Sequence, residues 1–452
     1  MHTLDALRAG ELAGTKRLNL ACGLTEFPTE IYGLADTLEI LDLSGNQLTT
    51  LPADLPRLNK LKIAFFSKNR FDHVPEVLSQ CPQLSMVGFK ANQIETVSDR
   101  ALPPNLRWLI LTDNRIERLP DTLGQLPHLQ KLMLAGNRLT ALPDLSACQR
   151  LELVRLSANR LQSLPEWVFR LPRLSWLAYA GNPCCPAWPT KQPTRSGSIL
   201  PEADWADLQI GKLLGQGASG TIFEGVWEQP QMKHADALKV AIKLFKGEMT
   251  SDGSPNDEMA ACITAGKHPN LVNAIAQVVN HPEGKAGLLL PLIPSDYGNL
   301  GGPPSLETCT RDTYGPETQF SLSQVCRIAA GIASAAGHLH TIGILHGDLY
   351  AHNILVDNRG DSLLGDFGAA SRYIPSGAAA HKLERLEVRA FGCLLEELLD
   401  RCTPGQQVPA PQVPDQQSSL VQLRHLQTRC LTPDPAQRPS FRQVSESLDR
   451  LP

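Results

Sequence analysis

The residues with the clearest chemical potential in this 452-residue chain lie in two short polar runs of its second half. The first run contains Asp348 and Asn353, and the second contains Asp366. Carboxylate and amide oxygens are the ligands that hard cations such as Mg²⁺ prefer, whereas the nearby His346 and His352 suit such cations poorly. These residue types therefore suit chemistry on a magnesium-bound phosphate, which needs oriented oxygen groups more than covalent catalysis.

A glycine-rich run and a lysine precede these acids and could bind phosphate. The run is Gly215-Gln216-Gly217-Ala218-Ser219-Gly220, with Ile222 two places beyond. Alternating apolar residues over 208–227 predict two strands around this glycine turn, whereas a dinucleotide-binding fold would need a helix after it. Lys243 ends the run Val240-Ala241-Ile242-Lys243, at the right distance for a third strand. A solvated surface lysine is the alternative interpretation.

These motifs, in this order over about residues 208–370, resemble those of protein kinases. The resemblance implies a bilobal α+β domain that binds ATP and Mg²⁺, with Asp348 as the base and with Asn353 and Asp366 as metal ligands. It places Lys243 on the α- and β-phosphates, held by a carboxylate of the next helix. Glu258 is the best match for that carboxylate, and Glu248 and Asp257 remain alternatives. The implied nucleotide contacts are Gly215, Gly217, Gly220, Ile222, Ala241, Lys243 and Leu355.

The resemblance continues to the C-terminal motif Asp434-Pro435-Ala436-Gln437-Arg438-Pro439-Ser440-Phe441, but with departures. Gly347 stands where many protein kinases carry Arg, Glu387 stands where Asp is usual, and no Ala-Pro-Glu motif follows Asp366. No Lys or Arg lies between Asp348 and Asn353, which predicts slow turnover. We expect an ATP- and Mg²⁺-dependent protein kinase, with Ser or Thr favoured over Tyr as the acceptor. The alternatives are a scaffold with a weak or inactive pseudokinase domain, and a small-molecule kinase of the aminoglycoside-phosphotransferase type.

The first half of the chain is an internal repeat, marked by asparagines at steps of 22 or 23 residues: Asn46, Asn69, Asn92, Asn114, Asn137, Asn159 and Asn182. Around most of them the frame reads leucine, two residues, leucine, one residue, leucine, two residues, asparagine. This pattern resembles the leucine-rich-repeat family over about residues 15–185 and implies an α/β solenoid of about eight repeats with caps. The asparagines are expected to bond backbone groups at the turns and to play no part in catalysis.

Within each predicted repeat strand, the residues between the inward leucines must face the concave side. Many of them are apolar: Ile40, Ile63, Phe65, Met86, Trp108, Ile110 and Trp176. Exposed apolar stripes of this kind are typical of protein interfaces. We therefore expect the concave face to bind a protein partner, a substrate or the chain's own kinase lobe; the alternative is a stripe that is covered locally or simply tolerated.

The composition and the proline-rich stretch between the two halves complete the predicted domain organisation. The repeat is expected over 1–185, a Pro-rich linker over 186–203, and the kinase-like domain over 204–452. A net charge of -4 gives no nucleic-acid footprint, and no apolar run is long enough to span a membrane. The N-terminus lacks a secretory signal, and the odd count of 11 cysteines suits a reducing compartment. We therefore expect a cytoplasmic protein.

Overall fold

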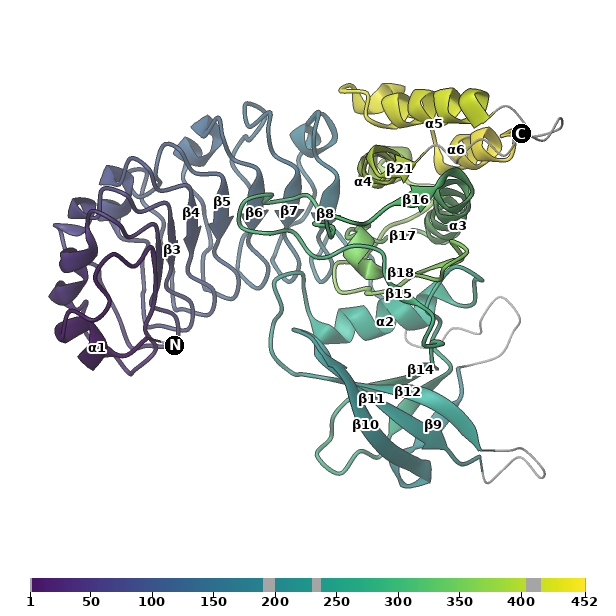
Figure 1. Cartoon of the computed structure of the whole chain (residues 1–452), viewed down its shortest axis with the longest axis horizontal. Helices are drawn as coiled ribbons and strands as arrows, with labels where there is room; N and C mark the ends of the chain where they lie inside the picture. Colours follow the sequence, from purple (N-terminus) through teal and green to yellow (C-terminus); the bar gives the residue numbers. More distant parts are fainter. Residues whose placement is uncertain (1, 190–199, 230–236, 404–415, 452) are drawn as a thin grey trace. The chain divides into compact units, whose positions relative to one another are not determined.

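A computed structural model describes residues 2–189, 200–229, 237–403 and 416–451 (Figure 1). The chain divides into two compact units. Met1–Leu174 and Asn182–Cys184 form the first, and Ser175–Gly181 and Cys185–Pro452 form the second. Most of the predicted linker, residues 190–199, lies outside the described residues, so the domain limits at 185 and 203 stay a prediction.

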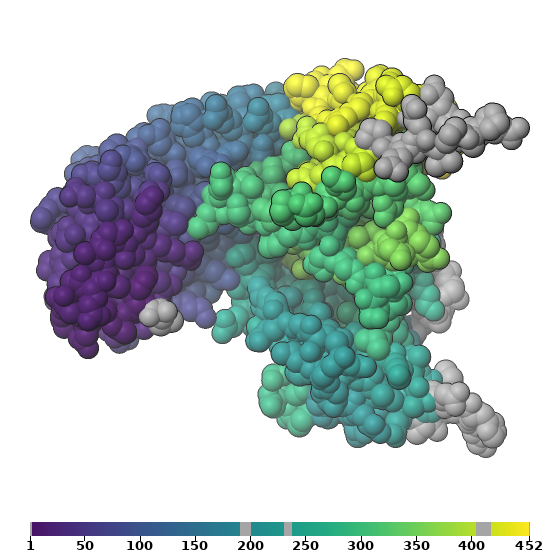
Figure 2. Space-filling model, viewed as in Figure 1, coloured from purple at the N-terminus to yellow at the C-terminus, as the bar shows by residue number. Residues whose placement is uncertain are grey.

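The predicted α/β solenoid is confirmed. Short strands follow one another in sequence order in one parallel sheet (Figure 1). They are β1 (Arg17–Asn19), β2 (Ile40–Asp42), β3 (Ile63–Phe65), β4 (Met86–Gly88), β5 (Trp108–Ile110), β6 (Lys131–Met133), β7 (Leu153–Arg155) and β8 (Trp176–Ala178). After helix α1 (Leu4–Arg8), the returns are 3₁₀ turns: η1 (Thr29–Leu34), η2 (Leu55–Arg57), η3 (Glu76–Gln80), η4 (Asp121–Gln125) and η5 (Glu166–Phe169). In the space-filling view the repeats of the first unit stack directly on one another, from purple to blue (Figure 2).

The repeated asparagines have the structural role expected of them. The side-chain oxygen of Asn69 accepts a hydrogen bond from the Leu48 amide at 2.9 Å. Its amide nitrogen donates to the carbonyls of Leu43 at 2.9 Å and Phe66 at 3.0 Å. Equivalent bonds recur at the other repeats, for example at Asn137. Each asparagine thus satisfies buried backbone groups of two successive turns.

The apolar stripe of the repeat strands is less open than predicted. Ile63, Met86 and Trp176 are only 8%, 2% and 2% exposed, because side chains on neighbouring strands pack against one another and, for Trp176, because it contacts Tyr350. These three are therefore not available to a partner in this structure, which corrects the expectation for them. Ile40, Phe65, Trp108 and Ile110 keep partly exposed side chains.

The second unit has two lobes, and its first lobe contains a six-stranded sheet in the order β10-β11-β12-β14-β13-β9 (Figure 1). The strands are β9 (Glu202–Asp204), β10 (Leu208–Gln216), β11 (Gly220–Trp227), β12 (Leu238–Phe245), β13 (Ala276–Val279) and β14 (Gly287–Pro291). Helix α2 (Pro255–Ala265) begins after Ser254, whose side chain accepts a hydrogen bond from the Asn256 amide, and ends before Gly266 at a φ of 65°. The two strands predicted around the glycine turn are β10 and β11, and the predicted third strand, which carries Lys243, is β12.

The second lobe is mainly helical and confirms the bilobal α+β class. Its helices are α3 (Leu322–Thr341), α4 (Ala380–Asp400), α5 (Gln416–Cys430) and α6 (Phe441–Leu448). Short strands connect them: β15 (Gly298–Asn299), β16 (Phe320–Ser321), β17 (Ile344–Leu345), β18 (Ile354–Val356), β19 (Ser362–Leu364), β20 (Ser371–Arg372) and β21 (Cys402–Thr403). Capping boxes begin α3 at Ser321 and α6 at Ser440. Among the helices of the described residues, none combines the length and apolar character that crossing a membrane requires.

Candidate active site

The glycines of the hairpin between β10 and β11 have different surroundings, and packing requires glycine at only one of the three positions. A Cβ at Gly220 would lie 2.6 Å from the carbonyl oxygen of Leu244, so the close approach of β11 to β12 demands glycine there. A Cβ at Gly215 or Gly217 would meet no atom within 4 Å, and neither residue adopts a positive φ. Packing within the protein therefore does not explain these two glycines, and the space beside them leaves room for a ligand close to the backbone.

Lys243 forms an ion pair with Glu258, which connects β12 to helix α2. Both side chains are largely buried, with 14% and 3% exposure. Burial alone would lower the pKa of Lys243, but the negative charges of Glu258 and Asp366 outweigh burial and raise it. The lysine is therefore held as a cation. Of the three candidate carboxylates, Glu258 is the one that the structure places on Lys243, while Asp257 accepts a hydrogen bond from Trp188.

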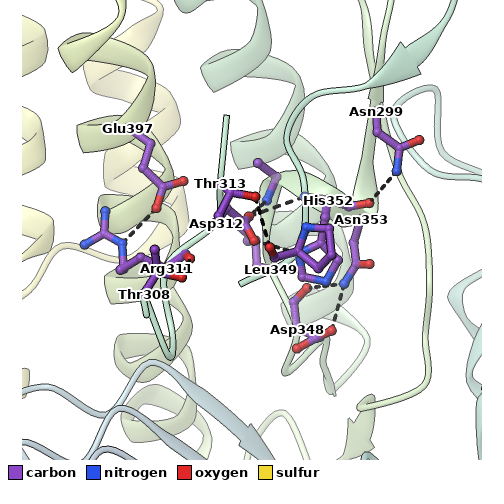
Figure 3. A network of polar contacts seen from close by, with 12 residues as sticks. Asn299, Thr308, Arg311, Asp312, Thr313, Asp348, Leu349, His352, Asn353 and Glu397 are labelled. Atoms are coloured by element: carbon purple, nitrogen blue, oxygen red, sulfur yellow. Dashed lines mark hydrogen bonds and ion pairs between the residues drawn. The ribbon is translucent and has the colours of Figure 1, made fainter. Parts of the chain in front are cut away.

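Asp348 and Asn353 are brought together on one loop, as Figure 3 shows. The side-chain amide nitrogen of Asn353 donates to the Asp348 carboxylate at 2.7 Å and to the Asp348 backbone carbonyl at 3.0 Å. Asn353 ends the short 3₁₀ helix η7 (Ala351–Asn353), and β18 follows directly. Because its nitrogen is engaged with Asp348, the side-chain oxygen of Asn353 is the atom left to act as a ligand.

Asp366 follows β19 and adopts a left-handed backbone conformation with a φ of 55°. This region is uncommon for residues other than glycine, although Asp tolerates it better than most. One oxygen of its side chain accepts from the Gly368 amide at 3.1 Å, which fixes the carboxylate at the turn. The left-handed backbone at Asp366 and the bond from Gly368 therefore fix the direction in which the carboxylate points after β19.

A cavity of about 150 Å³ joins the glycine hairpin to the acids. Among the predicted site residues, it is lined by Gly217, Gly220, Ile222, Lys243, Glu258 and Asp366. The rest of the lining is Ala218 and Ser219 of the glycine-rich run, together with Thr250, Asp252 and Gly368, which the sequence did not single out. Gly215, Ala241, Leu355, Asp348 and Asn353 lie outside this lining. Ala241 precedes Lys243 by two residues on β12, and Leu355 lies on β18, two residues after Asn353.

The oxygen ligands available here fit Mg²⁺ only in combination with a phosphate. Within the residues that the structure describes, no three His, Cys, Asp or Glu side chains converge closely enough to hold a metal ion by themselves. Magnesium commonly uses one or two protein oxygens and completes its shell with phosphate and water. Asp366 and the side-chain oxygen of Asn353 have the chemistry of such ligands.

Asp312 is a residue of this site that the sequence analysis missed. Its carboxylate accepts from the Ala351 amide at 2.5 Å and from the His352 amide at 3.3 Å, and its other oxygen lies 2.7 Å from Nδ1 of His352 (Figure 3). Burial would lower the pKa of His352, but the hydrogen bond to Asp312 and the charge of Asp348 outweigh it and raise that pKa. Asp312 lies in a stretch without a recognisable motif, so no sequence signal pointed to it.

Glu387 holds the other end of the same loop. It lies on α4 and accepts from the amides of His346 at 3.2 Å and Gly347 at 2.6 Å, with Nε2 of His340 2.8 Å away. Burial would raise the pKa of this carboxyl, but its contact with His340 outweighs burial and lowers the pKa. Glutamate in place of the expected aspartate therefore still anchors the loop that carries Asp348.

Comparison with known proteins agrees with this geometry. Residues 208–391 match the family model of protein tyrosine and serine/threonine kinases. Residues 37–58 and 104–147 match models of leucine-rich repeats. The chain therefore combines leucine-rich repeats with a protein kinase domain, as the motifs predicted.

Several of the similar proteins are named as probable serine/threonine-protein kinases. A probable serine/threonine-protein kinase of Dictyostelium discoideum is 26% identical over 285 residues, which is 56% of this chain and 19% of that protein. Probable serine/threonine-protein kinase drkC of the same organism is 25% identical over 286 residues, 55% of this chain and 35% of that protein. Ephrin type-A receptor 8 of Mus musculus is 25% identical over 301 residues, 58% of this chain and 28% of that receptor. The match thus spans a third or less of most of these proteins.

Proposed function

We propose that the protein is an ATP- and magnesium-dependent protein kinase that phosphorylates Ser or Thr hydroxyls. The observation that carries this proposal is the ion pair of Lys243 with Glu258 at the same cavity as Asp366. A buried lysine held as a cation beside a glycine hairpin suits the phosphates of a nucleotide. The names of the serine/threonine kinases among the relatives support the choice of hydroxyl.

Each site residue has a defined part in this proposal. Lys243 binds the α- and β-phosphates, and Glu258 holds its amine in place. Asp348 orients the attacking hydroxyl and accepts its proton, and its hydrogen bond from Asn353 fixes the carboxylate. Asp366 and Asn353 would hold Mg²⁺. When bound, that ion neutralises negative charge on the transferring phosphoryl group.

The repeats are proposed to bind a protein partner or substrate through the apolar residues that remain partly exposed: Ile40, Phe65, Trp108 and Ile110. The odd count of eleven cysteines supports a reducing compartment such as the cytoplasm. We keep 1–185 and 204–452 as the proposed limits of the two domains, noting that Ser175–Gly181 pack with the second unit.

Phosphate transfer from labelled ATP tests the proposal directly. The purified protein, incubated with Mg²⁺ and casein as a general acceptor, is expected to transfer label, and Lys243→Ala, Asp348→Ala and Asp366→Ala are expected to lose that transfer. Asp296→Ala is the matched control, because Asp296 is an exposed acid of the same domain outside the site. Transfer by the wild type no greater than by Asp348→Ala would favour the alternative of a scaffold with an inactive kinase domain.

A further inference from the structure

The residues that follow the last repeat asparagine, and the strand just before it, contact the catalytic parts of the kinase domain. These residues are Ser175–Gly181, which contain β8, and Cys185–Trp188, and both segments belong to the second unit. We call them together the strap. They are far in sequence from the residues that they contact, since Trp176 and Leu349 are 173 positions apart.

The strap first contacts the loop that carries Asp348. Trp176 is buried, its indole N–H donates to the Leu349 carbonyl at 3.1 Å, and its ring stacks on Tyr350 with centroids 4.3 Å apart and planes 8° from parallel. Leu349 and Tyr350 directly follow Asp348. The aromatic stack and the hydrogen bond therefore fix the backbone on the C-terminal side of the proposed base.

The strap also explains the glycine in the His-Gly-Asp run. Gly347 has a φ of 74°, and a Cβ at this position would lie 2.5 Å from the Leu177 carbonyl and 2.7 Å from the Ala369 carbonyl. The strap backbone thus occupies the space that a side chain at position 347 would need. The arginine found here in many protein kinases is incompatible with this packing.

The next contacts are with β20, in the short segment after Asp366. The Ser371 hydroxyl accepts from the amides of Tyr179 at 2.8 Å and Ala180 at 3.1 Å. The Tyr179 hydroxyl donates to the Arg372 carbonyl at 3.2 Å, and the Arg372 guanidinium donates to the Ala187 carbonyl. Ser371 is fully buried by these contacts, so the strap holds this segment in one conformation.

The last contact is with helix α2. The indole N–H of Trp188 donates to the Asp257 carboxylate at 3.0 Å. Asp257 directly precedes Glu258, the partner of Lys243. A fixed Asp257 therefore fixes the rotation of α2 that presents Glu258 to the lysine.

We propose that the strap is a built-in positioning element of the kinase site, in which Trp176 fixes the loop of Asp348 and Trp188 fixes the helix of Glu258. The proposal rests on the proposed kinase function and deepens it. In this proposal the end of the repeat region is part of the catalytic domain. The short segment after Asp366 is held in place by its contacts with the strap.

The two tryptophans are expected to affect different kinetic constants, because they act on different parts of the site. Trp176→Phe removes one hydrogen bond behind Asp348, so kcat is expected to fall about five-fold with KM for ATP unchanged. Trp188→Phe loosens the helix that holds Lys243, so KM for ATP is expected to rise about five-fold. Asp257→Asn keeps an acceptor for Trp188 and is expected to behave as the wild type, whereas Asp257→Ala is expected to match Trp188→Phe without adding to it in the double variant.

Trp205→Phe is the control, since Trp205 packs against the same lobe but contacts His281 and not the strap. Melting temperatures measured alongside separate a change in folding from a change in the site. Where the wild type transfers phosphate, the proposal is overturned if Trp176→Phe and Trp188→Phe have the same effect on kcat and on KM, if neither variant changes these constants, or if Trp176→Phe raises activity.

Hydrogen–deuterium exchange distinguishes failure of the strap from failure of the kinase function. Trp176→Phe is expected to increase exchange in residues 346–353, and Trp188→Phe in residues 255–265, relative to Trp205→Phe. If the wild type transfers no phosphate but these exchange changes occur, the kinase function fails and the strap stands. Unchanged exchange in both segments refutes the strap whatever the activity.

Discussion

Asp312 offers the sharpest test of how this site is held. Its side chain is fully buried and accepts from two backbone amides and one imidazole, all on the loop between Asp348 and Asn353. Asp312→Ala removes both oxygens and leaves these donors without their acceptor, the Ala351 amide within a buried residue. Two of the contacts, to Ala351 and to the His352 ring, are short at 2.5 and 2.7 Å, and the third is weak at 3.3 Å.

The expected cost follows from these contacts. A hydrogen bond to a charged group is worth about 1.5–3 kcal/mol, and breaking a buried pair by removing one partner costs about 3–5 kcal/mol. We therefore expect Asp312→Ala to destabilise the loop by about 3 kcal/mol, since water entering the space offsets part of the loss. Asp312→Asn keeps an acceptor for the Ala351 amide, so about 1.4 kcal/mol is expected.

The assay is hydrogen–deuterium exchange of the Ala351 amide, which reports local opening without assuming that both units unfold together. The two energies correspond to exchange about 150-fold faster in Asp312→Ala and about ten-fold faster in Asp312→Asn. Asp296→Ala, an exposed acid of the same domain, is the control and is expected to exchange at the wild-type rate. Exchange of Ala351 that is equally slow in Asp312→Ala and in the control would refute the role given to Asp312.

Two further predictions concern the glycine hairpin and the repeats. Gly220→Ala is expected to destabilise the first lobe by about 1–3 kcal/mol because its Cβ would overlap a backbone carbonyl, whereas Gly217→Ala should leave the melting temperature unchanged and weaken ATP binding about ten-fold. Thermal melting and nucleotide titration of both variants test this pair. Equal melting temperatures of the two variants would contradict the prediction. Asn137→Ala is expected to cost about 2–4 kcal/mol, since it removes three buried hydrogen bonds, while Asn105→Ala removes one exposed bond and should cost under about 1 kcal/mol. Urea unfolding of these two variants measures the difference, and similar midpoints would argue against the asparagine ladder as a source of stability.

Local patterns were enough to predict the architecture and to name the residues from which the candidate site is built. The asparagine spacing predicted the solenoid because each repeat buries its leucines against its neighbours, so the same frame must recur at every turn. The sequence singled out Lys243, Glu258, Asp348, Asn353 and Asp366 because each lies in a short run of characteristic residue types, and their catalytic roles stay a prediction. Only the structure, however, could show which carboxylate pairs with Lys243. Asp257 and Glu258 are adjacent in sequence but point in different directions from the helix, toward Trp188 and toward Lys243.

The tertiary structure alone decided which residues hold the site in place. Asp312, Glu387 and Trp176 reach the loop of Asp348 from three separate elements, and Trp176 does so across 173 positions of sequence. The sequence predicted Trp176 on an open binding face because its strand alternates like the others. Its burial against Tyr350 depends on the packing of a distant segment, and no local period carries that information.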